Sequence, residues 1–129
     1  MTTVWIVFAG AIGCVARWLI EEFVQQRGSS HRAYATMAVN IMGAGITGFV
    51  LYWASHAQWS PSQLHSFTTN IEPVLLTGFC GGFTTFSSAL AIPYLDWRTG
   101  HRLRASALIG ATPVLCFAGM LLGELVARV

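Results

Sequence analysis

The sequence predicts an all-α membrane protein with four membrane-spanning helices in a single domain, residues 1–129. Three observations predict this class. Hydrophobic residues make up 54% of the chain and charged residues only 9%, far below the roughly 25% charge of a soluble domain. Four long apolar stretches alternate with polar segments, and each approaches the roughly 20 residues that a helix needs to cross a bilayer. The third stretch carries small and hydroxyl residues at mid-depth, which predicts a helix that is broken near its middle.

The predicted spans cover residues 4–20, 33–54, 74–95 and 105–127. The first span ends at Glu21, and no basic segment of a cleaved signal peptide precedes it, so we expect it to be retained. Between the second and third spans, Ser60 followed by Pro61 predicts the start of a short interfacial helix, with serine as the cap and proline at the first helical position.

Small residues at helical spacing in the second and fourth spans predict close helix packing. They are Gly43, Ala44, Gly45 and Gly48 in the second span and Gly119 and Gly123 in the fourth. Four thin helices can hardly enclose a polar path alone, so we expect the chain to form an oligomer.

The third span contains the most informative segment of the chain. Residues 78–88 read Gly-Phe-Cys-Gly-Gly-Phe-Thr-Thr-Phe-Ser-Ser. Adjacent glycines followed by hydroxyl residues indicate a broken helix whose freed carbonyls face protein, water or an ion, because lipid cannot satisfy them. The alternative is an intact helix that packs closely through its small residues. The segment by itself leaves both interpretations open.

The basic residues predict one fixed orientation in the membrane. All seven are arginines, too dispersed to form a nucleic-acid-binding patch. Five lie near the spans on the side of the first and third loops, and one lies on the side of the termini. The five are Arg27, Arg32, Arg98, Arg102 and Arg104, against Arg128. The positive-inside bias therefore predicts cytoplasmic first and third loops and external termini.

Several residues at depth have a structural and a functional interpretation. Arg17, in the first span, either snorkels to the interface with help from Glu21 one turn later or forms an electropositive vestibule for an anion. Asn40 either joins two helices or offers an amide donor to a pathway. Phe83 and Phe86 either pack in the core or present ring edges, which carry partial positive charge, to a small anion. The four histidines fall in loops without a nucleophile or metal-ligand spacing, so we expect no enzyme.

Three ordered motifs resemble those of the CrcB/Fluc fluoride channels. The segment 78–88 closely resembles the third-span signature of that family, usually Gly-x-x-Gly-Gly-Leu-Thr-Thr-Phe-Ser-Thr-Phe. Residues 10–18, Gly-Ala-Ile-Gly-Cys-Val-Ala-Arg-Trp, look like its first-span glycine–arginine motif. Residues 35–43, Ala-Thr-Met-Ala-Val-Asn-Ile-Met-Gly, are similar to its second-span motif. The resemblance covers essentially the whole chain.

The resemblance implies a passive fluoride channel in the inner (plasma) membrane of a prokaryote, which lowers the cytoplasmic fluoride concentration and its toxicity. It implies an antiparallel dimer with two narrow fluoride pathways. A structural sodium ion, which is not transported, would lie at the dimer centre on the backbone carbonyls of Gly81 and Thr84. The positions that match the fluoride pathway are Asn40, Phe86, Thr36, Ser87 and Ser88, with Arg17 near the vestibule.

Departures from the family pattern lead to a hypothesis about the partner. Ala89 replaces the second phenylalanine of the third-span signature, Ser88 replaces a threonine, and only Thr112 matches the family pattern in the fourth span. Together with the lopsided arginines, this favours a heterodimer with an oppositely oriented paralogue over a homodimer. The alternatives are a non-conducting partner subunit and a small four-helix multidrug-type transporter, which would need a carboxylate deep in the first span.

Overall fold

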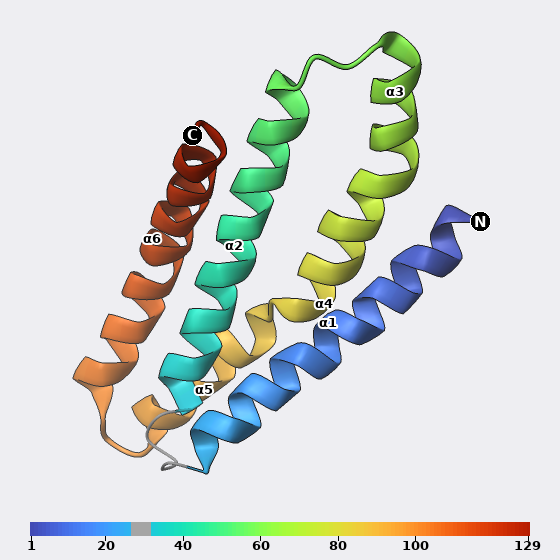
Figure 1. The fold of residues 1–129 in the computed structure, drawn as a ribbon. Helices are drawn as coiled ribbons and strands as arrows, with labels where there is room; N and C mark the ends of the chain where they lie inside the picture. The colour runs from blue at the N-terminus through green and yellow to red at the C-terminus, as the bar shows by residue number, and fades with distance from the viewer. Residues whose placement is uncertain (27–31) are drawn as a thin grey trace.

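The computed structural model describes residues 1–26 and 32–129 (Figure 1). Within these ranges all regular structure is helical. The helical segments are α1 (Thr2–Gln25), α2 (Arg32–His56), α3 (Pro61–Ser66), η2 (Phe67–Ile71), η3 (Val74–Cys80), α4 (Gly81–Phe83), α5 (Phe86–Arg98) and α6 (Arg102–Ala127). The segments η2 and η3 are wider π-helical turns, and they join α3 and α4 into one long rod.

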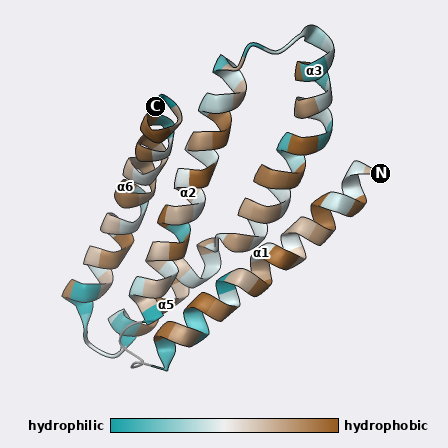
Figure 2. Ribbon diagram, in the orientation of Figure 1, coloured by the Kyte–Doolittle hydropathy of each residue, from teal (hydrophilic) through white to brown (hydrophobic). Residues whose placement is uncertain are grey.

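Among the described residues, four helices are long and apolar enough to cross a membrane, which confirms the predicted number of spans. They are Thr2–Gln25, Arg32–His56, Pro61–Arg98 and Arg102–Ala127. Hydrophobic residues run along these helices, and polar residues gather where α2 and α6 begin and where α1 and α5 end (Figure 2). Arg32, Arg98 and Arg102 lie at this end of the bundle, whereas Arg27 falls outside the described residues. Both termini lie toward the opposite end (Figure 1).

The third span begins earlier than the sequence predicts. Ser60 and Gln63 form a reciprocal capping box, and Pro61 is the first helical residue, so the predicted helix start is confirmed. This helix is not a separate interfacial element, however, because it continues through η2 and η3 into the bilayer-spanning segment. The predicted start of the third span at residue 74 is therefore wrong, since its helix begins at Pro61. Pro73 has no backbone N–H to donate, but the helix does not end there. The wide turns on either side of it accommodate the proline.

The helix α2 occupies the centre of the bundle, between α6 on one side and α1 on the other (Figure 1). Its contact with α6 depends on glycines. A Cβ on Gly48 would overlap the Met120 carbonyl, and a Cβ on Gly123 would overlap the Gly45 carbonyl. The backbones of α2 and α6 therefore touch directly, as the small-residue pattern predicts.

Of the adjacent glycines of the third span, Gly82 serves close packing, and neither glycine breaks the helix. Gly81 and Gly82 are helical residues of α4, and Gly82 lies against the backbone of Gly10 in α1. The helix breaks two residues later, at Thr84 and Thr85, which both have extended backbone dihedral angles. Both interpretations of the segment 78–88 are thus realised, at different residues.

The two neighbouring glycines provide a matched test of this packing. A Cβ on Gly82 would collide with the Gly10 carbonyl and Cα, whereas a Cβ on Gly81 meets only the Leu76 carbonyl oxygen, at 3.8 Å. We expect Gly82→Ala to destabilise the fold by about 1–3 kcal/mol, because overpacking must push α1 and α4 apart. Gly81→Ala should leave the fold intact. Thermal unfolding of the purified variants, followed by tryptophan fluorescence, measures both changes, and equal melting temperatures would contradict the assigned packing.

Candidate functional site

The break in the third span is held open by a side chain of α2. The Asn40 amide nitrogen donates to the Thr85 carbonyl at 3.0 Å, and the Thr85 N–H donates to Asn40 Oδ1 at 2.8 Å. Asn40 thus pairs with both polar backbone groups of one residue, as a neighbouring β-strand would. One turn later, Gly43 leaves room for the Thr84 methyl group. The helix α2 therefore supplies both the clamp and the space that the extended residues need.

The break leaves the carbonyls of residues 81–84 without the N–H donors that a continuous helix would give them, and Gly81 and Thr84 are the first and last of these residues. In an uninterrupted helix the Thr85 N–H would donate to the Gly81 carbonyl, and the Ser88 N–H would donate to the Thr84 carbonyl. Here the Thr85 N–H goes to Asn40, and the Ser88 N–H goes to Thr85 Oγ1 at 3.3 Å, which caps α5. The carbonyls of Gly81 and Thr84 are the two that the family resemblance assigns to sodium. Carbonyl oxygens at a helix break are suitable ligands for a hard cation.

An open groove of about 660 Å³ runs along the third span between α2 and α6. Gly81, Thr84, Phe86 and Ala89 all line it. Most of the remaining lining is apolar, so the groove brings a polar helix break to an otherwise hydrophobic surface. Lipid chains offer no hydrogen bonds to such a break.

The two phenylalanines after the glycines have different environments. Phe83 is 2% exposed and its ring stacks on Phe79, with centroids 5.5 Å apart. Phe83 is therefore a core residue. Phe86, the first residue of α5, is 79% exposed, so its ring edge is free to contact a partner or a ligand.

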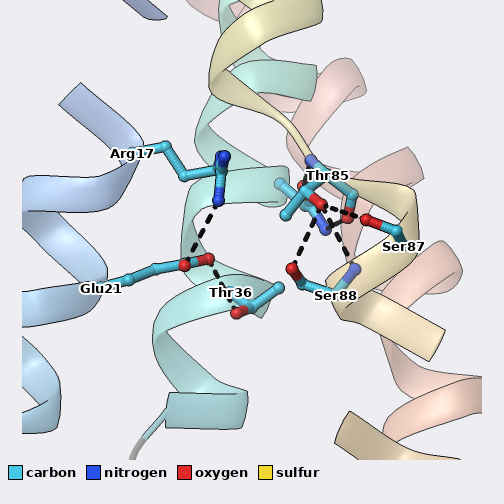
Figure 3. A network of polar contacts seen from close by, with 7 residues as sticks. Arg17, Glu21, Thr36, Thr85, Ser87 and Ser88 are labelled. Atoms are coloured by element: carbon cyan, nitrogen blue, oxygen red, sulfur yellow. Dashed lines mark hydrogen bonds and ion pairs between the residues drawn. The ribbon is translucent and has the colours of Figure 1, made fainter. Parts of the chain in front are cut away.

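Hydroxyl groups gather at the start of α5. Thr85 Oγ1 lies 3.2 Å from Ser87 Oγ and donates to Ser88 Oγ at 3.3 Å (Figure 3). Ser88, Thr36 and Thr112 line a small cavity of about 10 Å³, close to the space that a single water molecule requires. The Thr112 hydroxyl is turned to the Leu108 carbonyl, at 2.7 Å.

A second polar network connects α1 with α2. Arg17 Nη1 lies 3.4 Å from Glu21 Oε2, and the Thr36 hydroxyl donates to Glu21 Oε1 at 3.0 Å (Figure 3). The helix α1 extends to Gln25, beyond the predicted span end at residue 20, so Glu21 lies inside the helix. Glu21 is only 7% exposed. The predicted pairing of Arg17 with Glu21 is confirmed.

Five of the predicted site residues thus belong to one of two hydrogen-bonded groups. Asn40, Ser87 and Ser88 surround Thr85 at the break, while Arg17 and Thr36 meet at Glu21; Figure 3 shows both groups in one view. Phe86, Gly81 and Thr84 lie along the groove.

Sequence reasoning missed two members of the site. Thr85 is one, although a threonine three residues before Ser88 is a recognisable helix-cap pattern. Glu21 is the other. Its spacing of four residues from Arg17 signals the ion pair, but nothing local signals the contact with Thr36.

The fold and the site define a class: a small multi-pass membrane protein built around a broken helix that a side-chain amide clamps. Comparison with known proteins identifies the family. Residues 4–124 match the family model described as "CrcB-like protein, Camphor Resistance (CrcB)", and the chain belongs to this family.

Relatives match over most or nearly all of the chain's length. A protein of Chlorobaculum tepidum named fluoride-specific ion channel FluC is 37% identical, over 97% of this chain and 97% of its own length. One of Renibacterium salmoninarum with the same name is 33% identical, over 95% and 96%. A third, fluoride-specific ion channel FluC 2 of Cutibacterium acnes, is 37% identical over 69% and 67%.

Proposed function

We propose that this chain is a subunit of a fluoride channel that passively exports fluoride across the inner membrane of a prokaryote. The single observation that carries the proposal is the Asn40 clamp on Thr85, because it exposes carbonyls and hydroxyls where a plain helix would expose none. The names of the full-length relatives support fluoride as the ion. The negative membrane potential would drive the anion outward without an energy-consuming step.

The groove supports assembly into an antiparallel dimer. Its apolar lining could face lipid, but the polar break at Gly81, Thr84 and Thr85 within it could not. A second subunit placed over the groove would cover the break. In an antiparallel pair, the third spans of the two subunits would cross near these residues.

A sodium ion fits the centre of such a dimer. The freed carbonyls of Gly81 and Thr84 supply two oxygen ligands from each subunit, and hard cations prefer oxygen ligands. Bound there, sodium would supply positive charge that holds two broken helices together. The ion would be structural and would not be transported.

The fluoride path would follow the polar groups of α2 and α5. Phe86 would contribute its ring edge from the groove, and the Asn40 amide would retain one N–H beyond the one given to Thr85. The hydroxyls of Ser87, Ser88 and Thr36 would continue the path. Figure 3 shows Ser87, Ser88 and Thr36 in this order, from the start of α5 toward α2.

The second subunit would be an oppositely oriented paralogue. Ala89 lines the groove where the family signature has a second phenylalanine, so a partner would have to supply that ring. The same observation favours a second candidate function, a non-conducting partner that only completes the path of its paralogue. Cytoplasmic first and third loops would fix the orientation.

Fluoride efflux from liposomes tests the proposal. The purified chain is reconstituted alone and with a paralogue from the same genome, and a fluoride electrode records release. We expect liposomes that contain the chain and its paralogue to release fluoride, and liposomes that contain the chain alone to release little. Robust efflux from the chain alone would contradict the heterodimer, and no efflux from either preparation would contradict the channel.

A second arm of the same experiment tests the sodium ion. Replacing sodium on both sides by N-methylglucamine should abolish efflux and shift the protein from dimer to monomer on size exclusion. Efflux and dimer that persist without sodium would remove the ion from the proposal.

A further inference from the structure

The network of Arg17, Glu21 and Thr36 contains a group that the proposed fluoride path does not use. Glu21 is buried at the interface of α1 and α2, and each of its carboxylate oxygens has a partner of its own. Oε2 faces the Arg17 guanidinium at 3.4 Å, and Oε1 accepts from the Thr36 hydroxyl at 3.0 Å. The carboxylate therefore lies between two donors that come from different helices.

These two donors are the kind that bind a small anion. A guanidinium offers several N–H groups and a positive charge, and a hydroxyl offers one directed proton. Arg17 and Thr36 bind the Glu21 carboxylate in the same way that they would bind a free anion. In the part of the chain that the structure describes, Arg17 Nε is also buried without a hydrogen-bond partner. One donor of the guanidinium thus remains available beside the carboxylate.

We propose that Glu21 is a tethered anion: its carboxylate occupies the Arg17–Thr36 donor pair and competes with fluoride for it. The inference deepens the proposed function, since it assigns these two donors to anion contact. Fluoride and the carboxylate carry the same charge, so both cannot occupy one donor pair without strong repulsion. Glu21 thereby limits how strongly the Arg17 end of the path attracts anions.

Neutralising Glu21 without changing its shape tests this role. In Glu21→Gln the side chain keeps its size, but the neutral amide binds the two donors less strongly than the carboxylate does, and Arg17 loses its counter-charge. We expect fluoride to take its place, so that replacing sodium chloride by sodium fluoride raises the melting temperature of the full-length variant by about 4 °C more than that of the wild type. Glu22→Gln, which changes the exposed neighbouring carboxylate, should respond like the wild type.

A double variant ties the effect to the arginine. Arg17→Met combined with Glu21→Gln removes the charge that would bind fluoride, so the extra shift should disappear. If Glu21→Gln does not fold in chloride, purification in fluoride should rescue it. Failure in both salts, or equal fluoride shifts in Glu21→Gln and the wild type, would overturn the proposal.

The thermal measurement does not depend on conduction, so it separates the two proposals. Absence of fluoride efflux from liposomes that hold both the wild-type chain and its paralogue would contradict the channel, and the thermal result would still decide on Glu21. In the conducting assembly, Glu21→Gln should raise the initial efflux rate by about threefold, because a binding site at the entrance concentrates the anion. An unchanged or lower rate would also overturn the tethered-anion role.

Discussion

Replacing Asn40 by alanine is expected to collapse the break in the third span and to abolish fluoride efflux. Asn40 is 8% exposed and makes two hydrogen bonds to the backbone of Thr85. Its removal leaves a part-buried N–H and a part-buried carbonyl without partners, which costs about 2–5 kcal/mol. The chain can recover part of this cost by closing the helix through Thr85, and that would withdraw the Gly81 carbonyl from any ligand. Thermal unfolding and electrode-recorded efflux measure the two consequences.

Asn70→Ala is the matched control for this substitution. Asn70 also makes two side-chain hydrogen bonds, with Thr2 and Ser66, but it is exposed. Water can replace these bonds, so the stability should change by less than about 0.5 kcal/mol. If the Asn40 variant were as stable and as active as the Asn70 variant, the clamp would have no role in the fold or in transport.

Replacing Phe86 by isoleucine is expected to reduce fluoride efflux by about tenfold or more while leaving the fold unchanged. The Phe86 side chain is 79% exposed, so little packing within the chain depends on its ring. An aromatic ring has a partially positive edge that can contact an anion, and an aliphatic side chain has none. Loss of that contact should therefore appear in transport and not in stability. Efflux from liposomes and the melting temperature of the same preparation separate these effects.

Phe117→Ile serves as the control, because Phe117 on α6 is also strongly exposed but does not line the groove. Its efflux should match that of the wild type. Normal efflux in Phe86→Ile, or an equal loss in Phe117→Ile, would show that the ring of Phe86 does not line the path.

Local chemistry in the sequence predicts most of the fold. The four apolar stretches have the length that a bilayer imposes, so the spans can be counted without a structure. The Ser60 cap could be predicted because it joins residues that are only three positions apart in the sequence. Gly48 and Gly123 are recognisable because close helix packing requires small residues wherever two backbones touch.

The start of the third span and the position of its break were harder to predict. Pro73 and the polar residues before it indicate a loop, but the helix accommodates the proline in wide turns within the bundle. Adjacent glycines indicate a flexible point, yet Gly82 is helical because α1 packs against it. Tertiary contacts override the local preference at both places.

By itself the sequence determined that this protein crosses the membrane four times and that its third span is irregular, because hydrophobicity and residue type act locally. Only the tertiary structure decided that the break falls at Thr85 and that Glu21 lies between two donors. Both features need partners from another helix: Asn40 is 45 residues from Thr85, and Thr36 is 15 residues from Glu21. Hydrogen bonds over such separations depend on how the helices are placed in space, and no pattern within a single span encodes that placement.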